Sequence, residues 1–242
     1  MPTVRANGID LYYELHGQGE PLVLIGGLGV DSTFFRPLTE AFAKQFRVLS
    51  FDNRGAGRSD KPDVPYTIEL MATDAIALMD ALGMERAHLV GISMGASIAL
   101  ALVLDQPGRV KRMVLVSASA RKTMEMRVSR PFRLIGFLGR ILPIAEGKYP
   151  QPEYAFQRQL IASRSYNCSP RLGEIRVPTL VMHGRKDRTV PLQLAEELHA
   201  GIAGSQLVTF KGGHVFFLFP ERKRFLEESL RFLASRRPTN SP

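Results

Sequence analysis

The sequence contains little cysteine and no long apolar run. Cys168 is the single cysteine among 242 residues, so neither an intramolecular disulfide nor a cysteine-based metal site is possible. An isolated thiol suits a reducing compartment. No stretch of about 18 apolar residues is present, as a membrane-spanning helix would require. Residues 1–17 also lack an apolar segment behind a basic leader, which a signal peptide would need. We therefore expect a protein of the cytoplasm without a membrane span.

Motifs for nucleic-acid binding are absent too, although the formal net charge is +9. The charge is unevenly distributed: residues 1–120 hold 11 Lys/Arg and 13 Asp/Glu, whereas residues 121–171 hold 10 and 3. Because no recognised motif accompanies this basic segment, we expect no nucleic-acid partner. Two interpretations of the segment stay open. It is either a solvated face that keeps the protein soluble or a region that attracts an anionic ligand.

Apolar runs of strand length alternate with helical patterns through most of the chain. An antiparallel strand is predicted at 9–15, and buried strands at 21–27, 46–52, 87–93, 110–117, 178–184 and 205–210. Helices are predicted at 33–45, 66–82, 94–105, 191–201 and 217–235. This alternation predicts right-handed βαβ units, and thus an α/β fold with a parallel sheet covered on both faces.

The alternation is interrupted over residues 119–172, which contain no good buried strand. Prolines break this stretch into short predicted helices: Pro131, Pro143, Pro150 and Pro152. We therefore expect one sheet domain, formed by 1–118 and 173–242, with a helical insertion at 119–172.

A candidate nucleophile lies in Gly91-Ile92-Ser93-Met94-Gly95, between a predicted strand and a predicted helix. That context is what a G-x-S-x-G motif needs. The turn is so tight that side chains at 91 and 95 would collide with backbone. Ser93 is forced into a strained conformation that raises its hydroxyl above the sheet edge, at the positive end of the next helix. The alternative is a turn of small residues that merely packs.

A base and its orienter are expected at the same edge of the sheet. His214 follows the last strand, so its loop opens at the carboxyl end, where Ser93 also lies. Asp187 follows strand 178–184, and its alternative role is to form a turn or cap a helix. The order Ser93, Asp187, His214 matches one of the known orders of serine triads. We expect His214 to remove the Ser93 proton, Asp187 to orient His214, and His183 to hold the Asp187 turn.

Two backbone N–H groups are candidates for an oxyanion hole. One belongs to Met94, directly after the candidate nucleophile. The other is predicted at Leu28, in the Gly26-Gly27-Leu28-Gly29 loop, where glycines let the backbone approach a substrate closely. A plain glycine turn is the alternative. We also expect Gly27 and Val215, next to the base, to line the substrate pocket.

Five segments together carry a family resemblance: LVLIGGLG, FDNRGAGRSD, GISMG, PTLVMHGRKD and GGH. In this order they resemble the α/β-hydrolase superfamily, in the branch of small bacterial esterases and lactonases with a helical cap. The resemblance implies a mostly parallel eight-stranded sheet, a cap after the sixth strand, an acyl-serine intermediate, and no metal or organic cofactor. Ser93 argues against relatives that use an aspartate nucleophile. Leu28 and the basic cap argue against proline-releasing peptidases.

The predicted cap contains an apolar stripe within residues 127–149 that includes Phe132, Phe137 and Leu138. The stripe packs on the sheet domain, forms an acyl-binding wall, or lies on a membrane surface, the last being least consistent with an insertion. Its arginines would form a basic rim for the acyl-binding wall: Arg130, Arg133 and Arg140.

These observations predict a serine hydrolase that cleaves a small-molecule carboxylic ester or lactone. A basic rim would suit an anionic substrate or an acyl group linked to a carrier protein. Two alternatives remain open. One is a C–C bond hydrolase with the same triad, and the other is a non-catalytic ligand receptor that has kept the fold.

Overall fold

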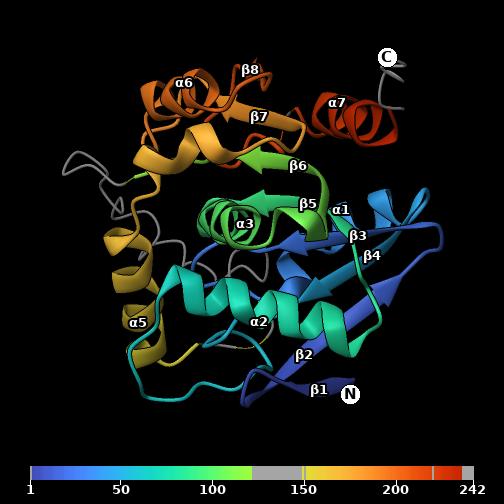
Figure 1. Ribbon diagram of the computed structural model, residues 1–242, viewed down its shortest axis with the longest axis vertical. Helices are drawn as coiled ribbons and strands as arrows, with labels where there is room; N and C mark the ends of the chain where they lie inside the picture. The colour runs from blue at the N-terminus through green and yellow to red at the C-terminus, as the bar shows by residue number, and fades with distance from the viewer. Residues whose placement is uncertain (1, 122–148, 150, 220, 236–242) are drawn as a thin grey trace.

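The computed structural model describes residues 2–121, 149, 151–219 and 221–235. Within them the strands form one eight-stranded sheet, in the order β1-β2-β4-β3-β5-β6-β7-β8 (Figure 1). The strands are β1 (Thr3–Ala6), β2 (Ile9–His16), β3 (Glu20–Ile25), β4 (Phe46–Phe51), β5 (Ala87–Ile92), β6 (Val110–Val116), β7 (Thr179–Gly184) and β8 (Gln206–Phe210). Strand β2 is antiparallel to β1 and β4, and all other pairs are parallel. The predicted α/β fold is confirmed.

Helices cover both faces of this sheet, as predicted. They are α1 (Arg36–Phe42), α2 (Ile68–Ala81), α3 (Met94–Asp105), α5 (Glu153–Ser165), α6 (Leu192–Gly201) and α7 (Arg222–Ala234), with short 3₁₀ turns η1 (Ser32–Phe35), η2 (Pro107–Arg109) and η3 (Ser169–Glu174). Buried side chains of α2, α3 and α6 join one core cluster, and those of α1 and α7 join the other. Figure 1 shows α2 and α3 in front of the sheet.

The two clusters arise from the two-residue period of the strands. In β3, Val23 and Ile25 belong to the first cluster, whereas Leu22 and Leu24 belong to the second. A central parallel strand buries both faces, so it reads as a continuous apolar run. The carboxyl ends of the parallel strands then open at one edge of the sheet, where the candidate site lies.

Three local predictions differ from the structure. Strand β1 was not expected, because TVRA is short and mostly exposed at the sheet edge. The predicted helix 33–45 is divided into η1 and α1, with a proline in the first turn of α1. The last helix begins at Arg222 rather than 217, because the apolar residues Phe216 and Phe217 are buried in turns that precede it.

Between β6 and β7 the described residues contain α5, η3 and an isolated bridge between Arg121 and Asn167. Figure 1 shows α5 lying beside one end of α2. The division into 1–118, 119–172 and 173–242 stays a prediction. Across the described helices, none is long and apolar enough to cross a membrane.

Candidate active site

Ser93 occupies a strained turn between β5 and α3. Its φ and ψ are 55° and −114°, in the region that side-chain-bearing residues rarely adopt. A Cβ at Gly95 would lie 2.1 Å from the carbonyl oxygen of Ile25, and one at Gly91 would lie 2.6 Å from the carbonyl oxygen of Gly95. These contacts confirm the steric reason for both glycines. The Ser93 side chain, in contrast, remains partly exposed.

The three predicted side chains from three separate loops meet at this turn. The Nε2 atom of His214 lies 3.0 Å from Ser93 Oγ, and its Nδ1 atom lies 2.7 Å from Asp187 Oδ2. The other oxygen of Asp187 accepts the backbone N–H groups of Thr189 and Val190, at 2.8 and 2.9 Å. Asp187 therefore both shapes its turn and contacts the imidazole, with one oxygen for each.

This arrangement is chemically suited to proton transfer. The carboxylate of Asp187 is buried and favours a proton on the Nδ1 atom of His214. The Nε2 atom is then free to accept the hydroxyl proton of Ser93, and the carboxylate stabilises the resulting imidazolium. The N-terminus of α3 directly after Ser93 favours negative charge that develops there.

His183 lies close to the same carboxylate but makes a different contact. It is fully buried, and its Nε2 atom donates to the carbonyl oxygen of Val190 at 2.9 Å. It lies 3.5 Å from Asp187 Oδ2. Burial lowers the pKa of His183, because a charged imidazole would lose its solvation there. The geometry agrees with the prediction that His183 holds the turn.

The glycine loop after β3 lies against the serine. A Cβ at Gly27 would lie 3.4 Å from the Cβ of Ser93. The base of the loop is held by the buried side chain of Asn53, whose amide donates to the carbonyl oxygen of Gly26 at 3.0 Å. Met94 is the first residue of α3, and an N–H group at that position has no partner within the helix.

A cavity of about 80 Å³ opens next to Ser93. Its described lining is mainly apolar and consists of Gly27, Leu28, Val30, Phe34, Phe35, Ile92, Ser93, Thr189, His214, Val215 and Phe217. Gly27 and Val215 are among the residues that line this cavity, and Phe132, Phe137 and Leu138 lie outside the described residues. The sequence interpretation missed Val30, Phe34 and Phe35. Their position a few residues after the glycine loop was the available signal.

Ser117 is a further residue that the sequence interpretation missed. It follows β6 with a φ of 49°, and its side chain is fully buried. Its hydroxyl donates to the backbone carbonyl of His214 at 2.7 Å, so it ties the histidine loop to the sheet. A polar residue that follows an apolar run, at the same edge as Ser93, was the available signal.

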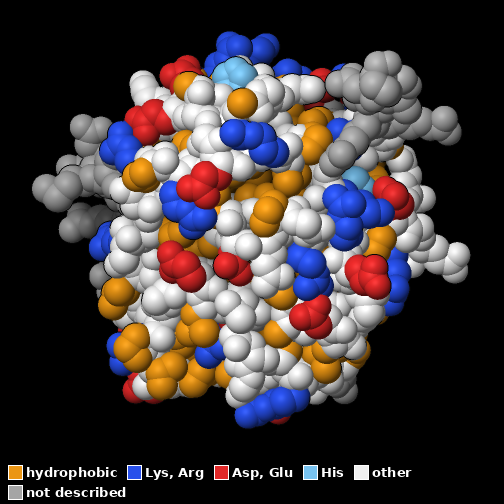
Figure 2. Space-filling model, in the orientation of Figure 1, with side chains coloured by type: hydrophobic (Ala, Val, Ile, Leu, Met, Phe, Trp, Pro, Cys, Tyr) orange, Lys and Arg blue, Asp and Glu red, His pale blue; other side chains and the backbone are white. Residues whose placement is uncertain are grey.

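The structure describes four arginines of the basic segment 121–171: Arg121, Arg158, Arg164 and Arg171. Three of its arginines form exposed ion pairs: Arg121 with Glu197, Arg158 with Asp63, and Arg171 with Glu174. In the view of Figure 2, Lys and Arg side chains are interspersed with Asp and Glu. Arg130, Arg133 and Arg140 lie outside the described residues, so attraction of an anionic ligand stays a prediction. Among described side chains, no group of three or more His, Cys, Asp or Glu could hold a metal ion.

The fold and the site are those of an α/β protein with a serine, a histidine and an aspartate at one edge of its sheet, and comparison with known proteins identifies the family. Residues 20–141 match the sequence model of the family described as the alpha/beta hydrolase fold. The chain belongs to this family. It is 31% identical over 250 residues to the putative carbamate hydrolase RutD of Azorhizobium caulinodans, covering 89% of this chain and 92% of that protein.

Two solved structures are similar along nearly the whole chain. The enol-lactonase from Burkholderia xenovorans is 27% identical, with a TM-score of 0.83 and coverage of 97% of this chain and 100% of that chain. A meta-cleavage product hydrolase from Pseudomonas fluorescens is also 27% identical, with a TM-score of 0.83 and coverage of 96% and 97%. Together with the family match, these similarities identify the chain as a hydrolase.

Proposed function

We propose that this hydrolase cleaves a carboxylic ester or lactone through an acyl-serine intermediate. The observation that carries the proposal is the hydrogen-bonded series Asp187–His214–Ser93, with distances of 2.7 and 3.0 Å. His214 removes the hydroxyl proton as Ser93 attacks the substrate carbonyl, and then protonates the leaving alcohol. A water molecule, activated by the same imidazole, releases the acid and restores the serine.

The tetrahedral intermediate needs donors for its oxyanion. We assign this role to the backbone N–H groups of Met94 and Leu28. Met94 begins the helix after the nucleophile, and Leu28 lies in the pocket lining together with Ser93. Both are main-chain donors on rigid supports, so they require little reorganisation during the reaction.

The lining of the cavity favours an apolar group next to the scissile carbonyl. Its polar side chains are Ser93, His214 and Thr189, and no Lys, Arg, Asp or Glu is among the described residues that line it. Burying a charged group there without a partner would be costly. A carboxylate or a carrier-linked chain would therefore lie away from the nucleophile.

Carbamate hydrolysis is a second candidate, because relatives such as RutD of Azorhizobium caulinodans are named putative carbamate hydrolases. Ser93 would attack the carbamate carbonyl while His214 takes its proton, and His214 would then protonate the leaving group to give a carbamoyl-serine. C–C bond cleavage of a ketonic substrate is a third candidate, supported by similarity to the meta-cleavage product hydrolase. The nearby apolar lining does not favour either over an ester.

The test is turnover by the purified protein on a matched panel of esters, lactones, carbamates and vinylogous diketones, beside labelling with a fluorophosphonate. We expect esters or lactones to be the best substrates, and Ser93→Ala to reduce kcat/KM by at least about a thousandfold in a folded protein. Near-normal turnover by Ser93→Ala would refute the mechanism. Higher kcat/KM on carbamates or diketones would replace the ester assignment. Absence of both labelling and turnover would favour a receptor.

A further inference from the structure

Helix α5 buries one glutamine, Gln159, against the loops of the candidate site. The side chain is fully buried. Its Oε1 atom accepts the backbone N–H of Gly29 at 3.1 Å, and its Nε2 atom donates to the backbone carbonyl of Arg54 at 2.7 Å. Because one partner can only donate and the other only accept, the orientation of the amide is determined. Gln159 thus joins two loops that are far apart in sequence.

A buried amide side chain is unusual on a helix whose buried face makes only apolar contacts. The other residues on the buried face of α5 are small: Ala155, Ala162 and Ser163. Burying the amide of Gln159 costs free energy unless its groups are hydrogen-bonded, and both bonds observed are to loop backbone. An apolar side chain at this position would fill the space and leave the Gly29 N–H without its acceptor.

Gly29 directly follows Leu28, whose N–H group we assign to the oxyanion hole. Gly29 has a φ of +75°, and a Cβ there would lie 3.0 Å from the ring of Phe156 on α5. Two residues earlier, Gly27 lies against Ser93. The loop is therefore held between α5 on one side and the nucleophile on the other, with Leu28 in between.

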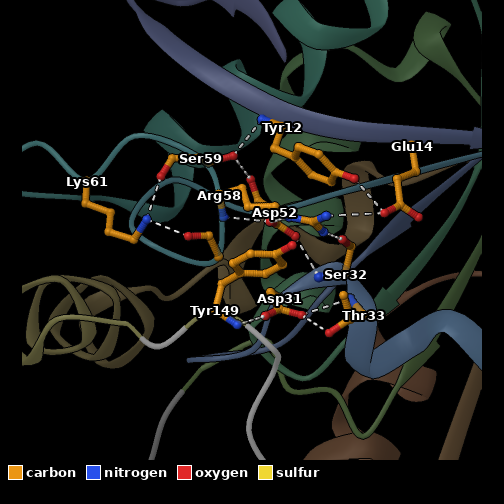
Figure 3. A network of polar contacts seen from close by, with 11 residues as sticks. Tyr12, Glu14, Asp31, Ser32, Thr33, Asp52, Arg58, Ser59, Lys61 and Tyr149 are labelled. Atoms are coloured by element: carbon orange, nitrogen blue, oxygen red, sulfur yellow. Dashed lines mark hydrogen bonds and ion pairs between the residues drawn. The ribbon is translucent and has the colours of Figure 1, made fainter. Parts of the chain in front are cut away.

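A second anchor holds the other end of the same loop. The backbone N–H of Tyr149, which precedes α5, donates to Asp31 Oδ2 at 3.0 Å. In Figure 3, Tyr149 lies over Arg58, whose guanidinium carbon is 4.4 Å from the Tyr149 ring centroid and 3.3 Å from that of Tyr12. Tyr149 is thereby attached to residue 31, two positions after Gly29.

We infer that Gln159 is a positioning residue that sets the direction of the Leu28 N–H towards the oxyanion. The inference rests on the proposed function, because the oxyanion hole that contains the Leu28 N–H is part of that proposal. A donor is most effective when it is already directed at the position where charge develops. Loss of the Gln159 bond frees Gly29 to rotate. The N–H of the preceding residue then loses its alignment, while the ground-state pocket is little changed.

The main variant is Gln159→Met, which keeps the length and volume of the side chain but removes both hydrogen bonds. Gln157→Met is the matched control, because Gln157 is exposed on the same helix and its side-chain amide donates to Glu153 within that helix. Gln159→Glu keeps an acceptor for the Gly29 N–H. For each variant we would measure kcat, KM, thermal unfolding, and the Kd of a trifluoromethyl ketone that forms a tetrahedral adduct with the serine.

In Gln159→Met we expect kcat to fall about tenfold or more with KM nearly unchanged, since a transition-state interaction is lost. The Kd of the ketone should rise by a similar factor. Gln157→Met should behave as wild type. Gln159→Glu should retain more kcat than Gln159→Met, even where it melts at a lower temperature, because a buried carboxylate destabilises the fold.

Unchanged kcat in a folded Gln159→Met protein would overturn the inference. It would also be overturned if kcat fell in all three variants in proportion to the decrease in melting temperature. Hydrogen exchange of the peptide that contains residues 26–31 gives a readout that does not depend on activity. Faster exchange in Gln159→Met than in Gln157→Met supports the positioning role, and equal exchange contradicts it. A wild-type protein with protected loop amides but no turnover on any ester would refute the proposed function instead.

Discussion

At the scale of single residues, two histidines with different surroundings lie near the carboxylate of Asp187. His214 is partly exposed and lies between Asp187 and Ser93, whereas His183 is fully buried and donates to a backbone carbonyl. Burial lowers the pKa of His183 and so favours its neutral form. His214 lies 2.7 Å from Asp187 Oδ2, whereas His183 lies 3.5 Å from the same atom. The distinction comes from which imidazole can reach the hydroxyl.

We therefore predict that His214→Ala and His183→Ala behave differently. His214→Ala should retain the wild-type fold and lose at least about a thousandfold in kcat/KM, as should Asp187→Asn, because triad members act as a unit. His183→Ala should mainly lower the melting temperature, because Val190 loses a buried partner. Steady-state kinetics and thermal melting check both. An active, folded His214→Ala beside a stable but inactive His183→Ala would reverse the assignment.

At the scale of elements, the loop that carries the histidine depends on the strand ends beneath it. Ser117, just after β6, adopts a positive φ of 49° and donates to the carbonyl of His214. Its own backbone N–H donates to the carbonyl of Met182 in β7 at 3.0 Å. A non-glycine residue in this conformation is strained, and the surrounding strands hold it there. Ser117 thus attaches the histidine loop to the ends of β6 and β7.

We predict that Ser117→Ala lowers kcat by about tenfold, because small misplacements of a reacting group are costly. The loss of one buried hydrogen bond should destabilise the fold by about 1–3 kcal/mol. Ser117→Thr, which keeps a hydroxyl, should recover part of kcat. Single-turnover acylation rates would measure the effect. The same acylation rate in Ser117→Ala and wild type would show that the bond does not position His214.

At the scale of the whole molecule, a buried ion pair joins regions distant in sequence. The guanidinium of Arg54 makes two hydrogen bonds to Asp74 on α2, at 2.7 and 2.6 Å, and both side chains are nearly fully buried. Asn7, in the turn between β1 and β2, also donates to Asp74. Because the carbonyl of Arg54 accepts from Gln159, the Arg54–Asp74 pair connects the turn between β1 and β2, α2 and α5.

We predict that Asp74→Ala destabilises the protein by about 3–5 kcal/mol, because it leaves the charge of Arg54 buried without its partner. Asp80→Ala is the control on the same helix, since Asp80 is exposed and its pair with Arg109 should contribute at most about 1 kcal/mol. Urea unfolding would measure both. Equal losses in the two variants would contradict the role of the buried pair. Replacing Arg54 and Asp74 together by apolar residues should recover part of the stability.

Much of the fold was predictable because its determinants are local. The helix 94–105 was predicted with the observed bounds, and the collisions at Gly91 and Gly95 follow from a turn that any sequence of this kind must make. The buried strands were recognisable from continuous apolar runs. Strand β1 was not, since TVRA has neither the length nor the apolar content to predict a strand without its partner β2.

The sequence by itself determined the strand–turn–helix around Ser93, the alternation that predicts a parallel sheet, and the loops that place Asp187 and His214 at one edge. These follow from steric limits and periodicity within short windows. Only the tertiary structure decided which side chains support that edge. The bonds from Ser117 to His214 and from Gly29 to Gln159 join residues 97 and 130 positions apart. Each is a single contact between a side chain and the backbone of a distant loop. Such a contact has no periodic pattern, because it exists only after the loops have been brought together by the packed core.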